Sequence, residues 1–240
     1  MQIGNIEFRA GLWPTIVTMV VFPFLLSLGF WQLDRAAQKI ALLDEYRAGS
    51  HDTVIQLQPG LRAFDGLNYQ IASAVGHFDD RHQFLLDNRT HEGFAGYEVY
   101  TPLLFRDAKV AVLVNRGWLP IVGNRDDFPN LDVGDSMRTV IGKIKSPSQP
   151  FLLGEDEKPT GWPMRIQSVK LEKLAAQLGY ELLPVVLLLD ADQDDGFTRE
   201  WHPLTFGPEK NKGYAAQWFG LALTLLIIYI AVNTRKIKRD

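Results

Sequence analysis

The chain has 240 residues, among them 25 Lys or Arg and 28 Asp or Glu, and its formal net charge is −3. Because it holds no cysteine, disulfides, thiolate nucleophiles and cysteine-ligated metals are excluded. Residues 34–213 carry 20 Lys or Arg against 26 Asp or Glu, and the basic residues are dispersed. This acidic balance provides no basic surface for nucleic acid, which is therefore not an expected partner.

Residues 10–33 form the first notable segment, 24 residues without a charge. A helix of about 20 apolar residues matches the hydrocarbon thickness of a bilayer. The alternative is a cleaved signal peptide, whose hydrophobic region is normally shorter and ends at small residues, whereas this run closes with bulky side chains. We therefore expect an uncleaved transmembrane helix over residues 11–33, kinked at Pro23 in its middle.

The next segment continues this helix and then gives way to strands. Apolar residues recur at helical spacing from Ala36 to Tyr46, so the first helix is expected to extend as an amphipathic helix that ends at Gly49. Alternating, β-branched and aromatic runs then predict six strands, of which the fourth and fifth form a hairpin joined at Arg106-Asp107. The six strands are predicted over residues 53–57, 69–78, 83–86, 97–105, 109–114 and 138–145.

Proline-rich loops follow at residues 147–150 and 159–163. Residues 169–178 carry leucines on one face and are followed by glycine, which predicts a short amphipathic helix. Residues 182–189 are almost all apolar, which favours a strand covered on both faces. We therefore expect one β-rich domain over residues 34–212, built as a barrel-like or strongly curved antiparallel sheet that carries one helix.

The second uncharged segment runs from Gly213 to Thr234 and holds 22 residues. A buried helix of a soluble protein is the alternative, and the matching segment at the start of the chain argues against it. The basic tail at residues 234–240 favours a cytoplasmic C-terminus, so residues 1–10 are also expected in the cytoplasm. The predicted fold class is an α+β membrane protein, in which a two-helix transmembrane hairpin, residues 11–33 and 213–233, flanks a β-rich extracytoplasmic domain.

The ten residues before the first helix hold no Arg- and Ser-rich amphipathic stretch of the kind found in organellar transit peptides. This favours a bacterial inner membrane, with the main domain in the periplasm.

The reactive residues of the sequence form no convincing metal-binding or catalytic pattern. His77 and His82 flank two aspartates, but their spacing suits neither a helical metal pair nor a zinc finger, so a solvated turn is the better interpretation. The acidic run at residues 190–195 resembles the start of a calcium loop but has Asp195 at the required glycine and Trp201 at the required glutamate, which favours an exposed acidic loop. No nucleophile with a nearby base is visible, so no enzyme activity is expected.

Two arginines each follow an asparagine near a predicted strand end, Arg89 in LLDNRTHEGFAGYEVYTPL and Arg116 in VLVNRGWLP. The planar guanidinium fork suits carboxylates. Two hypotheses remain open. The arginines form ion pairs within the domain, for example Arg116 with Asp87, or they capture an acidic group of a ligand or partner.

Four motifs in chain order, LGFWQLDRAAQK, LLDNRTHEGFAGYEVYTPL, VLVNRGWLP and GYAAQWFGLAL, resemble the Surf1 family of cytochrome c oxidase assembly factors from bacterial and mitochondrial inner membranes. The resemblance implies a non-enzymatic chaperone that helps place haem a into the large haem-copper subunit of the oxidase. The implied partners are that subunit, other oxidase assembly factors or haem a synthase, and the lipid bilayer. A structural subunit or adaptor of a respiratory complex is the alternative function.

The resemblance also implies haem a as a possible, transient cofactor. One departure stands at Asn211, where members of the family usually have a histidine considered as an iron ligand; asparagine is not a useful one. Two alternatives follow: haem is held by ring faces and by propionate pairing with arginine, or this member does not bind haem itself. The tryptophan–glutamine pairs of the two helices are expected to pack against each other or against a partner. The candidate residues for haem or partner contact are Trp31, Gln32, Arg35, Arg89, Arg116, Tyr214, Gln217 and Trp218.

Overall fold

The computed structural model describes residues 2–3, 6–49, 54–123, 128, 130–147, 161–201 and 207–236. Parts of the expected features lie outside these ranges: residue 53 of the first strand, residues 148–150 and 159–160 of the proline-rich loops, and residues 237–240 of the basic tail. The chain divides into two compact units, which are described separately. A helical unit comprises Met1–Asp44 and Pro203–Asp240, and a β-rich unit comprises Glu45–His202.

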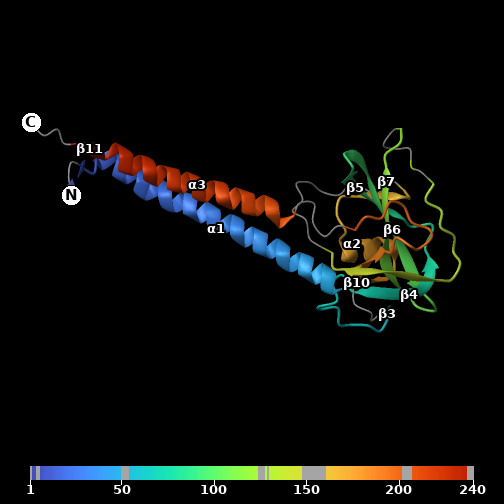
Figure 1. The fold of residues 1–240 in the computed structure, drawn as a ribbon. Coiled ribbons are helices and arrows are strands. Elements are labelled where there is room, and N and C mark those ends of the chain that lie inside the picture. Colours follow the sequence, from blue (N-terminus) through green and yellow to red (C-terminus); the bar gives the residue numbers. More distant parts are fainter. Residues whose placement is uncertain are drawn as a thin grey trace, which may run out of the picture. The chain divides into compact units, whose positions relative to one another are not determined.

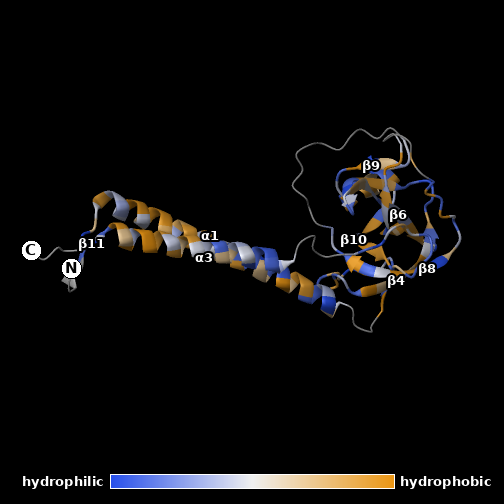
Figure 2. Ribbon diagram, turned by 45° about the horizontal axis from the view of Figure 1, so that its top comes forward, coloured by the Kyte–Doolittle hydropathy of each residue, from blue (hydrophilic) through white to orange (hydrophobic). Residues whose placement is uncertain are grey.

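The helical unit is built on α1 (Leu12–Ala48) and α3 (Pro208–Val232), which lie side by side (Figure 1). Each is long and apolar enough to cross a membrane. Hydrophobic residues dominate the half of each helix that lies nearer the chain ends (Figure 2). α1 passes through Pro23 without interruption and continues to Ala48, which confirms the predicted amphipathic extension.

Small residues bring the two helices close together. Gly29 of α1 faces the ring of Phe219, which occupies the space that a Cβ atom would need, and Phe30 makes an edge-on contact with the same ring at 5.3 Å between centroids. Thr15 Oγ1 lies 3.0 Å from Tyr229 Oη near the other end of the pair. Close backbone approach at small residues is typical of helices that associate in lipid. These contacts establish an antiparallel helix hairpin.

A small sheet of β1 (Gln2–Ile3), β2 (Ile6–Phe8) and β11 (Thr234–Lys236) joins the outer ends of the two helices. Asn233 reinforces this junction, since its side-chain Oδ1 accepts a hydrogen bond from the Gly11 backbone at 2.6 Å. Its carbonyl also accepts the backbone N–H of Arg9 at 2.8 Å. Sequence reasoning did not predict these three short strands.

The β-rich unit contains a closed barrel of five strands within the described residues (Figure 1). In ring order they are β4 (Ile71–Phe78), β8 (Arg138–Lys145), β10 (Glu181–Leu189), β7 (Val110–Pro120) and β6 (Phe94–Phe105), and β6 pairs with β4 to close the ring. The barrel-like alternative is therefore confirmed. The sheet is mixed, because β10 runs parallel to β7. The connection between these two strands includes α2 (Leu171–Leu178), as parallel pairing requires a crossover.

Three further strands extend the barrel sheet: β3 (Ile55–Leu57) beside β4, β5 (Phe84–His91) beside β6, and β9 (Met164–Ile166) beside β5. The barrel interior is filled by alternating apolar residues, including Leu103, Val112, Val114 and Leu187. The outer face of β5, β6, β7 and β10 carries a second apolar core, which α2 and β9 cover. β10 is therefore buried on both faces, as its apolar run predicts.

Candidate functional site

The eight candidate residues fall into both units. Six belong to the helical unit, and two belong to the β-rich unit. The helical set is Trp31, Gln32, Arg35, Tyr214, Gln217 and Trp218, and the β-rich set is Arg89 and Arg116.

Polar side chains join α1 to α3 near the end of the first uncharged run and just before the start of the second. Asn211 donates its Nδ2 hydrogen to Gln32 Oε1 at 2.7 Å, and its Oδ1 accepts a hydrogen bond from Lys39 Nζ at 2.8 Å. We call Gln32, Lys39 and Asn211 the polar clasp. Because both ends of the Asn211 amide are occupied, this residue acts as a link between helices. Gln32 bonds to Asn211 rather than to a glutamine of the opposite helix.

Aromatic and cationic groups beside the clasp remain exposed. The Trp31 side chain is 50% exposed, and the Arg35 guanidinium carbon lies 5.7 Å from the centre of its ring. Tyr214 is 43% exposed on α3, Gln217 is exposed, and Trp218 is half-buried. These side chains provide flat apolar surfaces with one positive charge nearby, a combination that suits aromatic groups bearing carboxylates.

Both Asn-Arg pairs lie at β-bulges, which the sequence did not reveal. In β7, Arg116 is an extra residue opposite the Val99–Tyr100 step of β6, and Gly117 follows with φ of +114°. In β5, the register shifts between Leu86 and Arg89, where Asn88 has φ of +58°. A bulge redirects the side chain that it carries. Asparagine is among the residues that tolerate positive φ, which explains its presence before Arg89.

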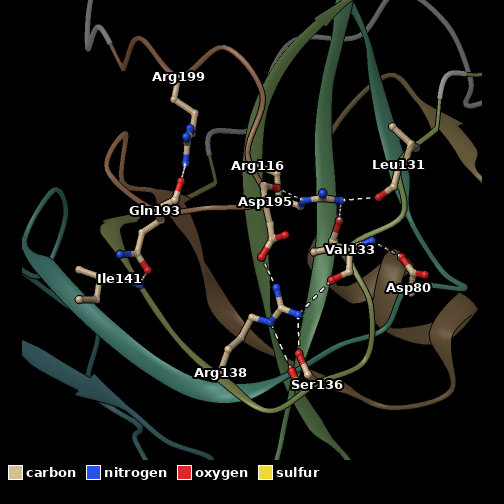
Figure 3. Close-up of polar contacts among 11 residues, drawn as sticks. Asp80, Arg116, Leu131, Val133, Ser136, Arg138, Ile141, Gln193, Asp195 and Arg199 are labelled. Carbon is tan, nitrogen blue, oxygen red and sulfur yellow. Dashed lines mark hydrogen bonds and ion pairs between the residues drawn. The ribbon is translucent and has the colours of Figure 1, made fainter.

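Arg116 is 2% exposed, and hydrogen bonds join its guanidinium to Asp195 and Leu131 (Figure 3). Its Nε donates to the Asp195 carbonyl at 2.7 Å, and one terminal nitrogen donates to the Leu131 carbonyl at 2.8 Å and to Gln83 Oε1 at 3.0 Å. Burial lowers the pKa of Arg116 to about 10, which the negative charges of Asp195 and Asp80 partly offset. The hypothesised partner Asp87 is not among these contacts, and the guanidinium holds two loops against the barrel.

The same loops are held by a second arginine (Figure 3). Arg138 of β8 pairs with the Asp195 carboxylate and donates to the Val133 carbonyl at 3.0 Å. Asp80 Oδ1 accepts the Val133 backbone N–H at 2.9 Å. Asp192, Asp194 and Asp195 are all exposed, which confirms the prediction of an exposed acidic loop, and the ion pair of Asp195 with Arg138 anchors it.

Arg89 lies in a different environment, at a pocket on the outer face of the barrel. Its Nε is 3.5 Å from Glu98 Oε1. The other oxygen of Glu98 accepts hydrogen bonds from Tyr100 Oη and Asn115 Nδ2, each at 2.8 Å. The pocket encloses about 200 Å³, and we call it the Glu98 pocket. Its polar lining residues are Arg89, Glu98, Tyr100, Lys145 and Ser168.

Sequence reasoning missed Glu98, Tyr100, Lys145 and Ser168. One signal was available, because Glu98 interrupts the otherwise apolar and aromatic run of its strand, and a charged residue in such a run needs a partner. Burial raises the pKa of Tyr100 well above its usual value, and the Glu98 charge adds to this effect, so the phenol remains a hydrogen-bond donor. Lys145 and Ser168 come from segments that are distant in sequence from Glu98.

Of the two histidines assigned to a turn, His77 lies in β4 instead, because it pairs with Leu104 of β6, and His82 makes local contacts. His82 Nδ1 is 2.7 Å from Asp79 Oδ2, and the same oxygen accepts a hydrogen bond from Tyr180 at 2.8 Å. The His82 ring also contacts Trp162 edge-on. Within the described ranges, no group of three His, Cys, Asp or Glu side chains is placed to hold a metal ion. His51 and His202 lie outside those ranges.

Comparisons with known proteins identify the family of this chain. The sequence model of the SURF1 family matches residues 19–223. A SURF1-like protein of Rickettsia conorii is 27% identical over 234 residues, which cover 93% of this chain and 92% of that protein. Surfeit locus protein 1 of Xenopus tropicalis is 25% identical over 234 residues, covering 88% of this chain and 73% of that protein. Since the family match spans most of its length, this chain belongs to the SURF1 family, a family of cytochrome c oxidase assembly factors.

Proposed function

We propose that this protein assists the delivery or insertion of haem a into the large haem-copper subunit of a cytochrome c oxidase. The observation that carries the proposal is the family match across two apolar helices and the barrel between them. Its proposed partners are that subunit, other assembly factors or haem a synthase, and the bilayer. The proposed role is that of a chaperone without catalysis.

The helical unit supports a specific mode of haem contact. The accessible ring of Trp31 and the half-buried rings of Trp218 and Phe219 suit a flat macrocycle, and Arg35 offers a cation for a propionate. Asn211 does not suit the iron, because its amide is already bonded at both ends within the polar clasp. The protein's own contribution is therefore to present ring surfaces and positive charge near the end of the apolar helix pair.

Arg89 and Arg116 differ in their suitability for this role. Arg89 is 44% exposed at its side chain and accessible to an acidic group, whereas Arg116 is enclosed by backbone carbonyls. We assign Arg116 to stability of the barrel, and retain Arg89 as a contact for a ligand or partner.

The proposed location is a bacterial inner membrane, with both termini in the cytoplasm and the β-rich domain in the periplasm. The two helices that are long enough to span a bilayer support this arrangement. In it, residues 11–33 and 213–233 span the membrane, residues 34–212 form the periplasmic domain, and residues 1–10 and 234–240 form cytoplasmic tails. Protease treatment of sealed inside-out vesicles should trim the tails and leave the domain intact. Digestion of the domain would instead indicate the opposite orientation.

The membrane spectrum of a deletion strain tests the function. We expect loss of the haem a signal with the haem b signal unchanged, and recovery on expression of the wild-type chain. A W31A/R35A double variant should restore the signal less than an L221A variant, which alters an exposed residue of α3 that is not among the candidate contacts. An unchanged spectrum and oxidase activity after deletion would refute the assembly role.

A structural subunit of a respiratory complex is the competing proposal, since the exposed ring faces of α1 and α3 also suit permanent packing against another membrane protein. Purification of the mature oxidase separates the two. Equal stoichiometry with the oxidase would support the subunit, whereas recovery only with partly assembled oxidase would support the chaperone.

A further inference from the structure

We propose that the Glu98 pocket binds the carboxylate of a small organic monoanion, held by Lys145 and Arg89 and completed by Ser168. The proposal stands on the pocket itself and can be tested on the purified protein, so it is independent of the role in oxidase assembly.

The first supporting observation is an unsatisfied polar group in the pocket wall. Ser168 lines the pocket and is 3% exposed, and its hydroxyl has no hydrogen-bond partner among the described residues. Leaving a hydroxyl buried without a partner costs about 1–3 kcal/mol. Such groups are rare in folded proteins, and each calls for an explanation. A ligand oxygen entering the pocket provides one.

The second observation is the charge of the lining. Glu98 is paired with Arg89 and accepts hydrogen bonds from Tyr100 and Asn115. Lys145 also lines the pocket and makes no ion pair with a described residue. The two cations and one carboxylate leave a net charge of about +1, which a single negative charge balances. A dianion such as phosphate would bring excess negative charge next to Glu98.

The third observation is the apolar part of the lining, which comes from Leu86, Pro147, Val169 and Val186. An apolar wall beside fixed polar groups is the usual composition of a small-molecule site. The volume of about 200 Å³ limits the enclosed part of the ligand to a short hydrocarbon chain with its acid group. A free short-chain acid and the propionate arm of a larger molecule share this chemistry.

Equilibrium dialysis of the full chain in detergent, with radiolabelled butyrate, tests the proposal. We expect saturable binding of butyrate and none of butyramide, its uncharged counterpart. K145M and R89M should each weaken binding by about tenfold, the size expected for losing one charge-assisted contact. The matched control is K109M, which alters an exposed lysine in the turn before β7 and should leave binding unchanged.

The S168A variant gives an independent readout. Because the substitution removes an unpartnered buried hydroxyl, the ligand-free protein should melt at the same temperature or higher, whereas the increase in melting temperature caused by butyrate should shrink. Competition by a porphyrin dicarboxylate would identify the propionate arm as the source of the carboxylate, and absence of competition would identify a free acid. Equal retention of butyrate and butyramide, or binding unaffected by both K145M and R89M, would overturn the proposal.

Discussion

The two units both use polar side chains to join separate segments, but they do so differently. In the barrel, Arg116 donates hydrogen bonds to backbone carbonyls of two loops, at Asp195 and Leu131, and to side-chain oxygens of Gln83 and Thr101, so one side chain links segments that are distant in sequence. Between the helices, the polar clasp joins side chains to side chains, and the close packing of Gly29 on Phe219 brings the backbones together. A buried charge supports the barrel fold, whereas close packing and a few side-chain hydrogen bonds, one of them donated by the Lys39 ammonium, support the helix pair.

The largest expected effect concerns Arg116. Replacing it with methionine keeps the volume but leaves the carbonyls of Asp195 and Leu131 without their donor, so we expect a loss of about 3 kcal/mol in the free energy of unfolding. Thermal and denaturant unfolding of the purified full chain will measure it. R106M, in an exposed turn, is the control and should lie within about 0.5 kcal/mol of the wild type. If both variants melted at the same temperature, Arg116 would not stabilise the fold as proposed.

The helix pair should be most sensitive at Gly29. A leucine there must displace the Phe219 ring, with an expected loss of about 1–3 kcal/mol in helix association. The natural chain has no cysteine, so Thr15→Cys with Tyr229→Cys allows a short thiol crosslinker to report helix pairing. G29L should lower the crosslinking yield.

Gly220 provides the matched control, because a Cβ atom at this position meets no atom within 4 Å. G220L should crosslink as well as the parent chain. If G29L and G220L gave the same yield, close packing at Gly29 would not determine how the helices associate.

Alkaline pH should weaken the β-rich unit. Burial raises the pKa values of Tyr100 and Tyr180 above their ordinary value of about 10. Their contribution to stability is therefore complete below pH 10 and is lost as the pH rises through the folded-state values, because the unfolded chain ionises first. Arg116, whose pKa is lowered to about 10, acts in the opposite direction in the same range and reduces the slope.

A Y180F variant sharpens this prediction. It loses the hydrogen bond to Asp79, so we expect about 1 kcal/mol less stability at pH 7 and a shallower decline above pH 10. Unfolding midpoints from pH 7 to 11 provide the measurement. A steeper decline in the variant than in the wild type would contradict the assignment.

The smallest effect is expected at the polar clasp. N211A should weaken helix pairing by about 0.6 kcal/mol, the average for hydrogen bonds between membrane helices. A double-mutant cycle with Q32A isolates the coupling, and Q217A serves as a control on an exposed position. Additive effects of N211A and Q32A would show that the clasp hydrogen bond adds nothing to pairing.

The sequence was sufficient wherever structure depends on local patterns. Uncharged runs predicted both helices, and the hairpin around Arg106-Asp107 agrees with β6 and β7, whose turn holds Asp107 at φ of +55°. β5 was predicted to end at Leu86 and actually continues to His91, because backbone pairing with β6 outweighs the weak strand propensity of its polar residues. β9 has only three residues, and it gains its partner β5 from about 80 positions earlier.

The site was less predictable, because it depends on contacts between segments that are distant in sequence. Arg89 and Arg116 attracted attention as similar Asn-Arg pairs, yet one lies at a surface pocket and the other is buried. That difference depends on two β-bulges and on loops around Leu131 and Asp195, which sequence spacing does not encode. Ser168 gave no signal at all, because an isolated serine before a helix is common and its lack of a partner is visible only in three dimensions.

The short sheet at the chain ends limits how the helix pair can move. β2 is hydrogen-bonded to β11 at one end of the hairpin, and Gln32 is hydrogen-bonded to Asn211 towards the other. A slip of one helix past the other by one turn, about 5.4 Å, would break both connections at once. These two connections thus hold the helices against axial sliding, and we expect the pair to tilt as a single rigid body.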